Sequence, residues 1–144
     1  MSNGRRSNQR SDDIKMVIGK IDKIEMLKDL KAKDFADEGG YADLVAKNSR
    51  DLKTTQLRKF FGAIRDIEME KDWDHMETSF YLLKPKLANS VGRKLIPQDF
   101  YQFMKVSMNK VDVGTEEEKV KNFKKLVEFV EAVVAYHKFY HPKA

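Results

Sequence analysis

Apolar residues recur at intervals of three and four along most of the chain, the spacing that places them on one face of an α-helix. The first periodic segment covers residues 12–31 and includes Ile14, Val17, Ile21 and Ile24. A Gly-Gly pair at residues 39–40 lies beyond this segment and disfavours a helix there, because glycine loses so much backbone freedom in a helix. A short helix over about residues 41–48 is predicted to follow. The first third of the chain therefore predicts helices.

The stretch KTTQLRKFFGAIR, residues 53–65, combines a helix start, an apolar face and a basic edge. A threonine hydroxyl at its beginning can accept a hydrogen bond from a free backbone N–H of the first turn, so we predict a helix from about Thr54 to Lys71. Its two phenylalanines could stack on nucleic-acid bases, but their helical phase favours the core. The apolar face consists of Leu57, Phe60, Phe61 and Ile64, and the basic edge of Arg58, Gly62 and Arg65.

The next predicted helix is capped by Asp72 and contains a proline. A proline removes one helical hydrogen bond and clashes with the carbonyl four residues before it. At Pro85 we therefore expect either a kink at Lys84 or a new helix with proline in its first turn. The shared apolar face consists of Trp73, Met76, Phe80 and Leu83.

Two further helices complete the pattern. Pro97 is suited to the first turn of a helix that ends near Lys110. Thr115 and Glu118 have the spacing of a capping box, which predicts the start of a last helix over about residues 116–140. The apolar repeat of that helix favours a long core helix over a free-standing coiled coil, since it lasts only about three heptads.

Composition supports an all-α protein, a compact bundle of five to six helices. The 144 residues are 41% hydrophobic and 35% charged, with seven glycines and three prolines, which disfavours a turn-rich β fold. Residues 12–144 are predicted to form a single helical domain. Residues 1–11 are polar and basic without an apolar pattern, so we expect a disordered basic arm there.

The charge, cysteine content and hydropathy restrict the function only broadly. A net charge of +5 is compatible with a polyanionic partner and also with a plain basic surface. The chain has no cysteine, which excludes disulfides and thiolate chemistry. No apolar run approaches the length of about 18 residues that a membrane span requires. We expect a soluble, cytoplasmic protein without membrane contact.

No catalytic pattern is visible in the sequence. It contains no nucleophile elbow, phosphate-binding loop or zinc-protease motif, and it has only three histidines. His137 and His141 are one helical turn apart and could chelate a metal, but no third ligand is close in sequence. We therefore expect no enzyme, no metal site and no cofactor.

Basic residues are concentrated in two stretches. Residues 47–65 contain six lysines and arginines against one acid, Asp51, and residues 83–94 contain no acid. Such clusters are typical of nucleic-acid binding, although basic residues beside a buried face can also serve only solubility. Lys59 points away from Arg58 on the helical wheel, so it could instead contact a neighbouring subunit.

Two segments, TTQLRKFFGAIR and LLKPKLANSVGR, resemble in order and separation the signature stretches of the small subunit of the type III-A CRISPR effector, the Csm complex. The resemblance covers about residues 53–93. Asn89 and Ser90 depart from the more apolar or aromatic residues that we expect at those positions. The resemblance implies a compact, non-catalytic helical protein that stacks in a filament with other copies of itself, beside the backbone and large subunits of the complex. It also implies that this protein holds target RNA paired with guide RNA in antiviral defence.

The resulting hypothesis is a groove that binds the phosphates of the target strand without reading its sequence. An alternative is a helical adaptor that docks an acidic protein through its basic edge, or a DNA-binding helix-turn-helix built on the second and third helices. A dimer of the free protein is a further expectation. The predicted RNA-binding residues are Lys53, Arg58, Lys59, Arg65, Lys84, Lys86 and Arg93.

Overall fold

A computed structural model describes the backbone of residues 2–144 and the side chains of residues 12–144. In this part of the chain there are seven α-helices, one short 3-10 helix and no strand, so the all-α class is confirmed, while the predicted number of helices was slightly too low. The helices are α1 (Ser2–Lys23), α2 (Ala32–Phe35), α3 (Tyr41–Lys47), α4 (Thr54–Glu68), α5 (Trp73–Gly92), α6 (Gln98–Asn109) and α7 (Glu116–Tyr140), with the 3-10 helix η1 (Leu27–Asp29) between α1 and α2.

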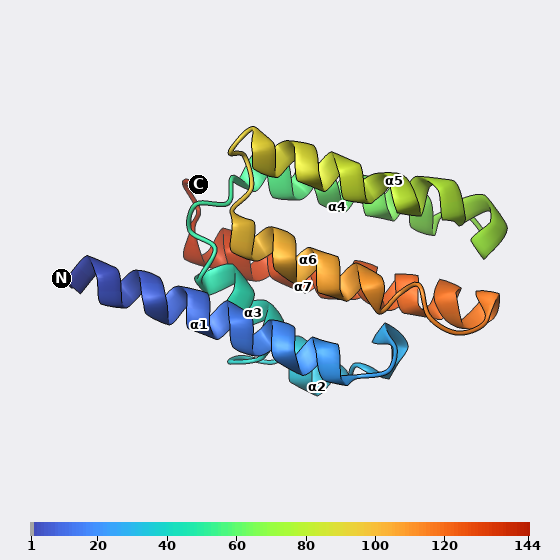
Figure 1. Ribbon diagram of the computed structural model, residues 1–144, viewed down its shortest axis with the longest axis horizontal. Coiled ribbons are helices and arrows are strands. Elements are labelled where there is room, and N and C mark those ends of the chain that lie inside the picture. The colour runs from blue at the N-terminus through green and yellow to red at the C-terminus, as the bar shows by residue number, and fades with distance from the viewer. Residues whose placement is uncertain (1) are drawn as a thin grey trace.

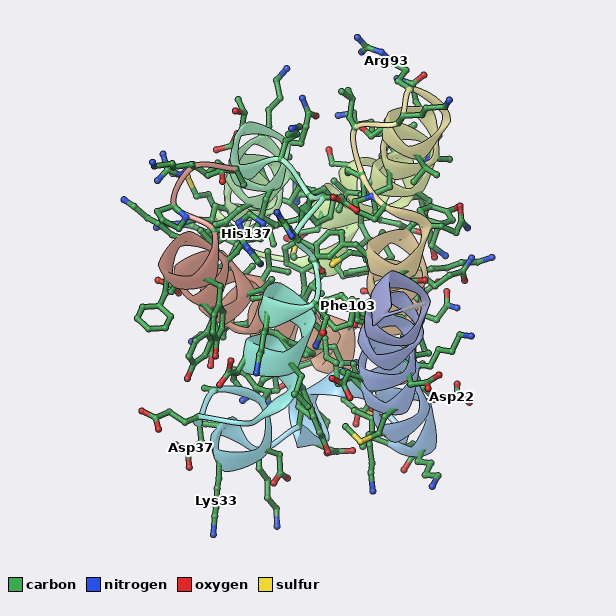
Figure 2. All side chains as sticks on the ribbon, turned by 90° about the vertical axis from the view of Figure 1, so that its left-hand side faces the viewer. Asp22, Lys33, Asp37, Arg93, Phe103 and His137 are labelled. Carbon is green, nitrogen blue, oxygen red and sulfur yellow. The ribbon has the colours of Figure 1, made fainter. Side chains whose placement is uncertain are left out.

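The long helices form three layers of two (Figure 1). Helices α4 and α5 lie on one side of the molecule, α6 and α7 in the middle, and α1 and α3 on the other side, with the short α2 below α3. Between the layers, α4 packs on α7, α5 on both α6 and α7, α1 on α6 and α3 on α7. The side chain of Phe103 lies in the middle layer (Figure 2), where its ring contacts Phe129 edge to face with centroids 5.2 Å apart.

The first helix ends at Lys23, and the prediction that it continues to residue 31 was wrong. Tertiary hydrogen bonds replace the helical ones here. The backbone N–H of Leu27 donates to the carbonyl of Lys110 over 2.9 Å, and that of Lys28 donates to the side chain of Asn122 over 2.8 Å. Because these partners lie far away in the sequence, the apolar period alone could not locate the break.

Helix α5 continues through Pro85, which excludes the second of the two alternatives, a new helix beginning there. Proline leaves the carbonyl of Tyr81 without its helical partner. Both residues are exposed, which gives that carbonyl access to water. The helix tolerates the proline at this position because the missing hydrogen bond is not buried.

Three helix starts can be compared with the predicted caps. The Asp72 side chain accepts a hydrogen bond from the backbone N–H of His75 at 3.0 Å, as predicted. Thr115 and Glu118 form the complete capping box at the start of α7. Helix α4 does begin at Thr54, but no side chain caps it, and the buried Thr54 hydroxyl has no hydrogen-bond partner within residues 12–144.

For the amino-terminal residues the structure describes the backbone but not the side chains. The backbone of α1 begins at Ser2, whereas side chains are described only from Asp12 onwards. The predicted basic arm of residues 1–11 lies outside the described side chains and stays a prediction.

Candidate nucleic-acid interface

Helices α4 and α5 form an antiparallel hairpin whose apolar faces are buried against α6 and α7 (Figure 1). Burial of one face of each helix fixes which residues point outward, because side chains three or four apart share a face. The exposed side of this hairpin is called the hairpin surface below. The buried residues are Leu57, Phe60, Ile64 and Ile67 from α4 and Trp73, Met76, Phe80, Leu83 and Leu87 from α5.

The two phenylalanines of α4 have different environments. Phe60 is buried in the core, as predicted. Phe61 is only half-buried and packs at the margin of the core, where the guanidinium carbon of Arg65 lies 5.8 Å from its ring centroid. This cation–π contact holds Arg65 at the border between the apolar face and the exposed face.

Lys59 and Lys86 face a common groove between α4 and α5. The groove has a volume of about 280 Å³, and both lysines are exposed. Two cations from different helices are thus brought to one depression of the hairpin surface. The remaining lining residues are Gln56, Phe60, Ala63, Leu83, Leu87, Ser90 and Ile96.

Arg58 and Arg65 are exposed on α4 and do not line this groove. They are seven positions apart, close to two turns, so they lie along one side of the helix with Gly62 between them. A Cβ atom added at Gly62 would meet nothing within 4 Å. No packing contact therefore requires glycine there, and the bare backbone leaves space beside the two guanidinium groups.

The other predicted residues lie at the ends of the hairpin or on its flank. Lys53 precedes α4, and the first turn of that helix contains no acidic residue, so its free N–H groups and the lysine charge both favour an anion. Arg93 follows α5 and extends away from the helices (Figure 2). Lys84 is half-buried and donates to the side chain of Asn109 at 3.3 Å, which turns it away from the groove towards α6.

None of the seven predicted cations forms an ion pair with a carboxylate among residues 12–144. Two lysines of α7 do form such pairs: the Nζ atom of Lys119 lies 3.0 Å from a carboxylate oxygen of Asp112, and the Nζ atom of Lys121 lies 3.6 Å from one of Glu117. The hairpin cations can therefore bind a phosphate without breaking an intramolecular ion pair.

Lys94 was not predicted, and it has an unusual backbone conformation. Its φ of 61° is the only positive value at a non-glycine residue in the described chain. The backbone N–H of Lys94 donates to the carbonyl of Val91, and the backbone N–H of Leu95 donates to the carbonyl of Ser90, both over 2.9 Å. This is the hydrogen-bond pattern of a Schellman motif. The motif favours glycine at this position, so a lysine costs about 1 kcal/mol.

Charge is segregated along the hairpin. Two stretches of the hairpin contain lysines and arginines and no acid: residues 53–65, which run along α4 as far as Arg65 in its last turn, and residues 84–94, at the end of α5. The opposite end, residues 66–77, contains Lys71 as its single lysine or arginine together with Asp66, Glu68, Glu70, Asp72, Asp74 and Glu77. Because the helices are antiparallel, the end of α5 lies beside the start of α4, where the other basic stretch begins (Figure 1).

The pair of histidines that suggested a metal site is part of the core packing at the end of α7. His137 is fully buried, and its ring centroid lies 5.0 Å from that of His141. The Nε2 atom of His141 lies 2.9 Å from the carbonyl oxygen of Ala46. Among the described residues, no group of three or more His, Cys, Asp or Glu side chains is arranged to hold a metal ion.

Within residues 2–144, no helix combines the length and apolar composition needed to cross a bilayer. The chain is thus a small helical protein that carries a group of exposed cations without ion pairs on the α4–α5 hairpin, within residues 12–144. Comparisons with curated proteins and with solved structures gave no match.

A family model described as Csm2 Type III-A matches residues 29–143, which includes both segments of the hairpin that carry the sequence resemblance. The chain belongs to this Csm2 family, and it is therefore a small subunit of the type III-A CRISPR Csm complex.

Proposed function

We propose that this subunit is a non-catalytic, RNA-binding structural component that holds target RNA paired with guide RNA during antiviral defence. It contacts the phosphates of the target strand through the hairpin surface. Several copies stack in a filament beside the backbone and large subunits of the complex.

The proposal depends mainly on the unpaired state of the hairpin cations. Arg58, Lys59, Arg65, Lys86 and Arg93 are exposed and have no carboxylate partner within residues 12–144. Binding a phosphate at these side chains replaces only water and counterions, and the release of counterions from RNA favours association. Lys53 and the free N–H groups at the start of α4 add positive charge beside these side chains, and Lys84 adds positive charge on the side of α5 that faces α6.

Sequence independence follows from the residue types. Arginine and lysine bind phosphate oxygens, and the narrow major groove of an A-form duplex hides the base edges from side chains. Neither phenylalanine of α4 offers a free ring for base stacking, because Phe60 is buried and Arg65 lies over the half-buried Phe61. Tyr81 of α5 is exposed, and its hydroxyl donates to Asp112. Gly62 lets a phosphate approach the α4 backbone between two guanidinium groups.

Repetition along a filament would multiply weak contacts. Each copy offers only a few phosphate contacts, so the isolated subunit is expected to bind RNA weakly. The assembled complex is the proper material for a test.

The test compares assembled complexes that contain Arg58→Ala or Arg65→Ala with unmodified complexes in a salt titration against target RNAs of different sequence. We expect uniform weakening across sequences and a salt slope that is shallower by about one for each phosphate that a copy no longer neutralises. Lys121→Ala removes an exposed lysine that is already paired with Glu117 and serves as the matched control. Unchanged RNA affinity in both arginine variants would refute the site, and weakening for some sequences alone would refute phosphate binding.

A further inference from the structure

A second groove lies on a different part of the molecule, between the end of α7 and the loop that joins α2 to α3. It has a volume of about 540 Å³ and is lined by Glu38, Asp43, Ala135, Tyr136, Phe139 and Tyr140. None of these residues belongs to the hairpin surface. We call it the acidic aromatic groove.

Hydrogen bonds hold the walls of this groove in place. The hydroxyl of Tyr140 donates to one carboxylate oxygen of Asp43 over 2.5 Å, and the backbone N–H of Gly39 donates to the other over 2.7 Å. The hydroxyl of Tyr136 donates to the carbonyl of Ala36 over 2.7 Å. Tyr136 is thereby bound to the α2–α3 loop and Tyr140 to α3, so the groove is formed before any partner arrives.

Phe139 is the exposed apolar element of the groove. Its side chain is 75% exposed, although its ring contacts Tyr140 edge to face with centroids 5.1 Å apart. An exposed phenylalanine contributes little to the fold, and burying it in a contact gains free energy from the apolar area removed from water. Its position at the mouth of a preformed groove makes it suited to such a contact.

The rim of the groove is acidic in a chain that is basic overall. Asp34, Asp37 and Glu38 are exposed in and beside the α2–α3 loop, and Asp37 lies at the outer edge of the molecule (Figure 2). Among residues 12–144, no lysine or arginine lines the groove. Burial, followed by the negative charges of Asp43, Glu38 and Asp37, raises the pKa of Tyr136. The carboxylates that line the groove favour a cation there over a nucleic acid, although Lys33 of α2 and Lys138 of α7 are exposed nearby in the sequence.

We propose that the acidic aromatic groove docks a cationic segment of a partner protein, with an arginine or lysine over the ring of Phe139 and its charge directed towards Glu38. The aromatic face and the carboxylate together favour a cation with an alkyl stem, which gains both a cation–π contact and an ion pair. This surface is independent of the hairpin surface, so one subunit can bind RNA on one side and a protein on another.

The test places the photoreactive residue p-benzoylphenylalanine at position 139 of the full chain, which is produced together with the other subunits of the complex and irradiated. Met69, which is 81% exposed at the acidic end of the hairpin, is the matched control position. Mass spectrometry of the cross-linked peptide identifies what lies at the groove. We expect a segment of another protein with a net positive charge, at a yield at least about tenfold above that at position 69, and a loss of that cross-link when Glu38→Lys is added.

Other outcomes overturn the proposal. Cross-links to RNA, to a second copy of this chain or to an acidic segment would show a different occupant. A yield at position 139 equal to that at position 69, or a cross-link that persists in Glu38→Lys, would show that the groove does not select a cationic partner. Circular dichroism of each variant checks that the helical fold is retained.

Discussion

The side-chain oxygen of Asn122 accepts a hydrogen bond of 2.8 Å from the backbone N–H of Lys28, a residue ninety-four positions earlier in the chain. The amide nitrogen of the same side chain donates to the carbonyls of Val111 and Val113 at 3.1 and 3.2 Å. Asn122 is fully buried, so these three bonds replace water for groups from two loops. One polar side chain of α7 thus joins the break after α1 to the turn before α7.

Replacing Asn122 with alanine is expected to destabilise the protein by about 3 kcal/mol, because backbone groups of Lys28, Val111 and Val113 lose their partner. Urea unfolding, with circular dichroism as the readout, measures the change in the free energy of unfolding. Asn89→Ala, at an exposed position of α5, is the control and should change the free energy of unfolding by less than about 0.5 kcal/mol. Equal effects in the two variants would contradict the role of Asn122.

Lys94→Gly is expected to stabilise the fold and weaken RNA binding at the same time. Glycine relieves the positive φ at the end of α5 and should add about 1 kcal/mol to the free energy of unfolding. If the hairpin surface binds phosphates, removing this charge reduces the affinity of the assembled complex for RNA. Lys94→Ala removes the charge but keeps the strained backbone, so it should weaken RNA binding without the gain in stability. A gain in stability from both variants would contradict the backbone explanation.

His137 makes stability depend on pH. Burial, and then the neighbouring His141, lower its pKa below 6.5, whereas the backbone groups of Ser49 and Leu52 act in the opposite direction. The unfolded chain therefore binds a proton at a higher pH than the folded chain, and stability is lost as pH falls below 6.5. We expect Tm to decrease between about pH 7.5 and pH 5.5, and His137→Leu to reduce this decrease.

His75 provides a control of opposite sign. Its hydrogen bond to Asp72 raises its pKa above 6.5, so any stabilisation that it gives is present at low pH and is lost as pH rises through the folded pKa. His75→Ala should therefore make the decrease of Tm on acidification steeper. A decrease that is unchanged in His137→Leu would exclude His137 as its source.

Two glycines should respond to alanine with opposite signs. A Cβ atom at Gly40 would lie 2.6 Å from the carbonyl oxygen of Asp34 and 2.8 Å from that of Asp37, so Gly40→Ala forces the backbone of the loop apart and is expected to cost about 2 kcal/mol. Gly62→Ala fills open space within a helix and should add about 1 kcal/mol. Thermal unfolding of the two variants measures the difference, and a loss of stability in Gly62→Ala would contradict it.

The sequence predicted those features that local chemistry determines. The capping box of Thr115 and Glu118, the cap at Asp72 and the bounds of α7 depend on neighbouring residues, and the structure confirms them. The break after Lys23 was missed because its hydrogen-bond partners, Lys110 and Asn122, are distant in sequence. The sequence left open whether α5 continues through Pro85, because that depends on which side of the helix faces water.

The candidate site was predictable in composition but not in arrangement. The helical wheel separated Lys59 from Arg58, but only the packing of α4 on α5 places Lys59 beside Lys86. Lys84 and Lys86 are two residues apart and therefore point to different sides of α5, and Lys84 reaches Asn109. The groove at Phe139 gave no recognisable sequence signal, because it brings together the α2–α3 loop and the end of α7, about a hundred residues apart.

The segregation of charge along the hairpin gives the molecule an electric dipole. A strong polyanion exerts a torque on such a dipole and turns the basic end of α4 and α5 towards itself before any contact forms. This orientation acts on the rate of association rather than on the strength of the final contacts, and salt weakens it over distances beyond about 10 Å. If the hairpin surface binds RNA as proposed, the acidic tip at residues 66–77 would help the subunit to arrive in the correct orientation without touching RNA.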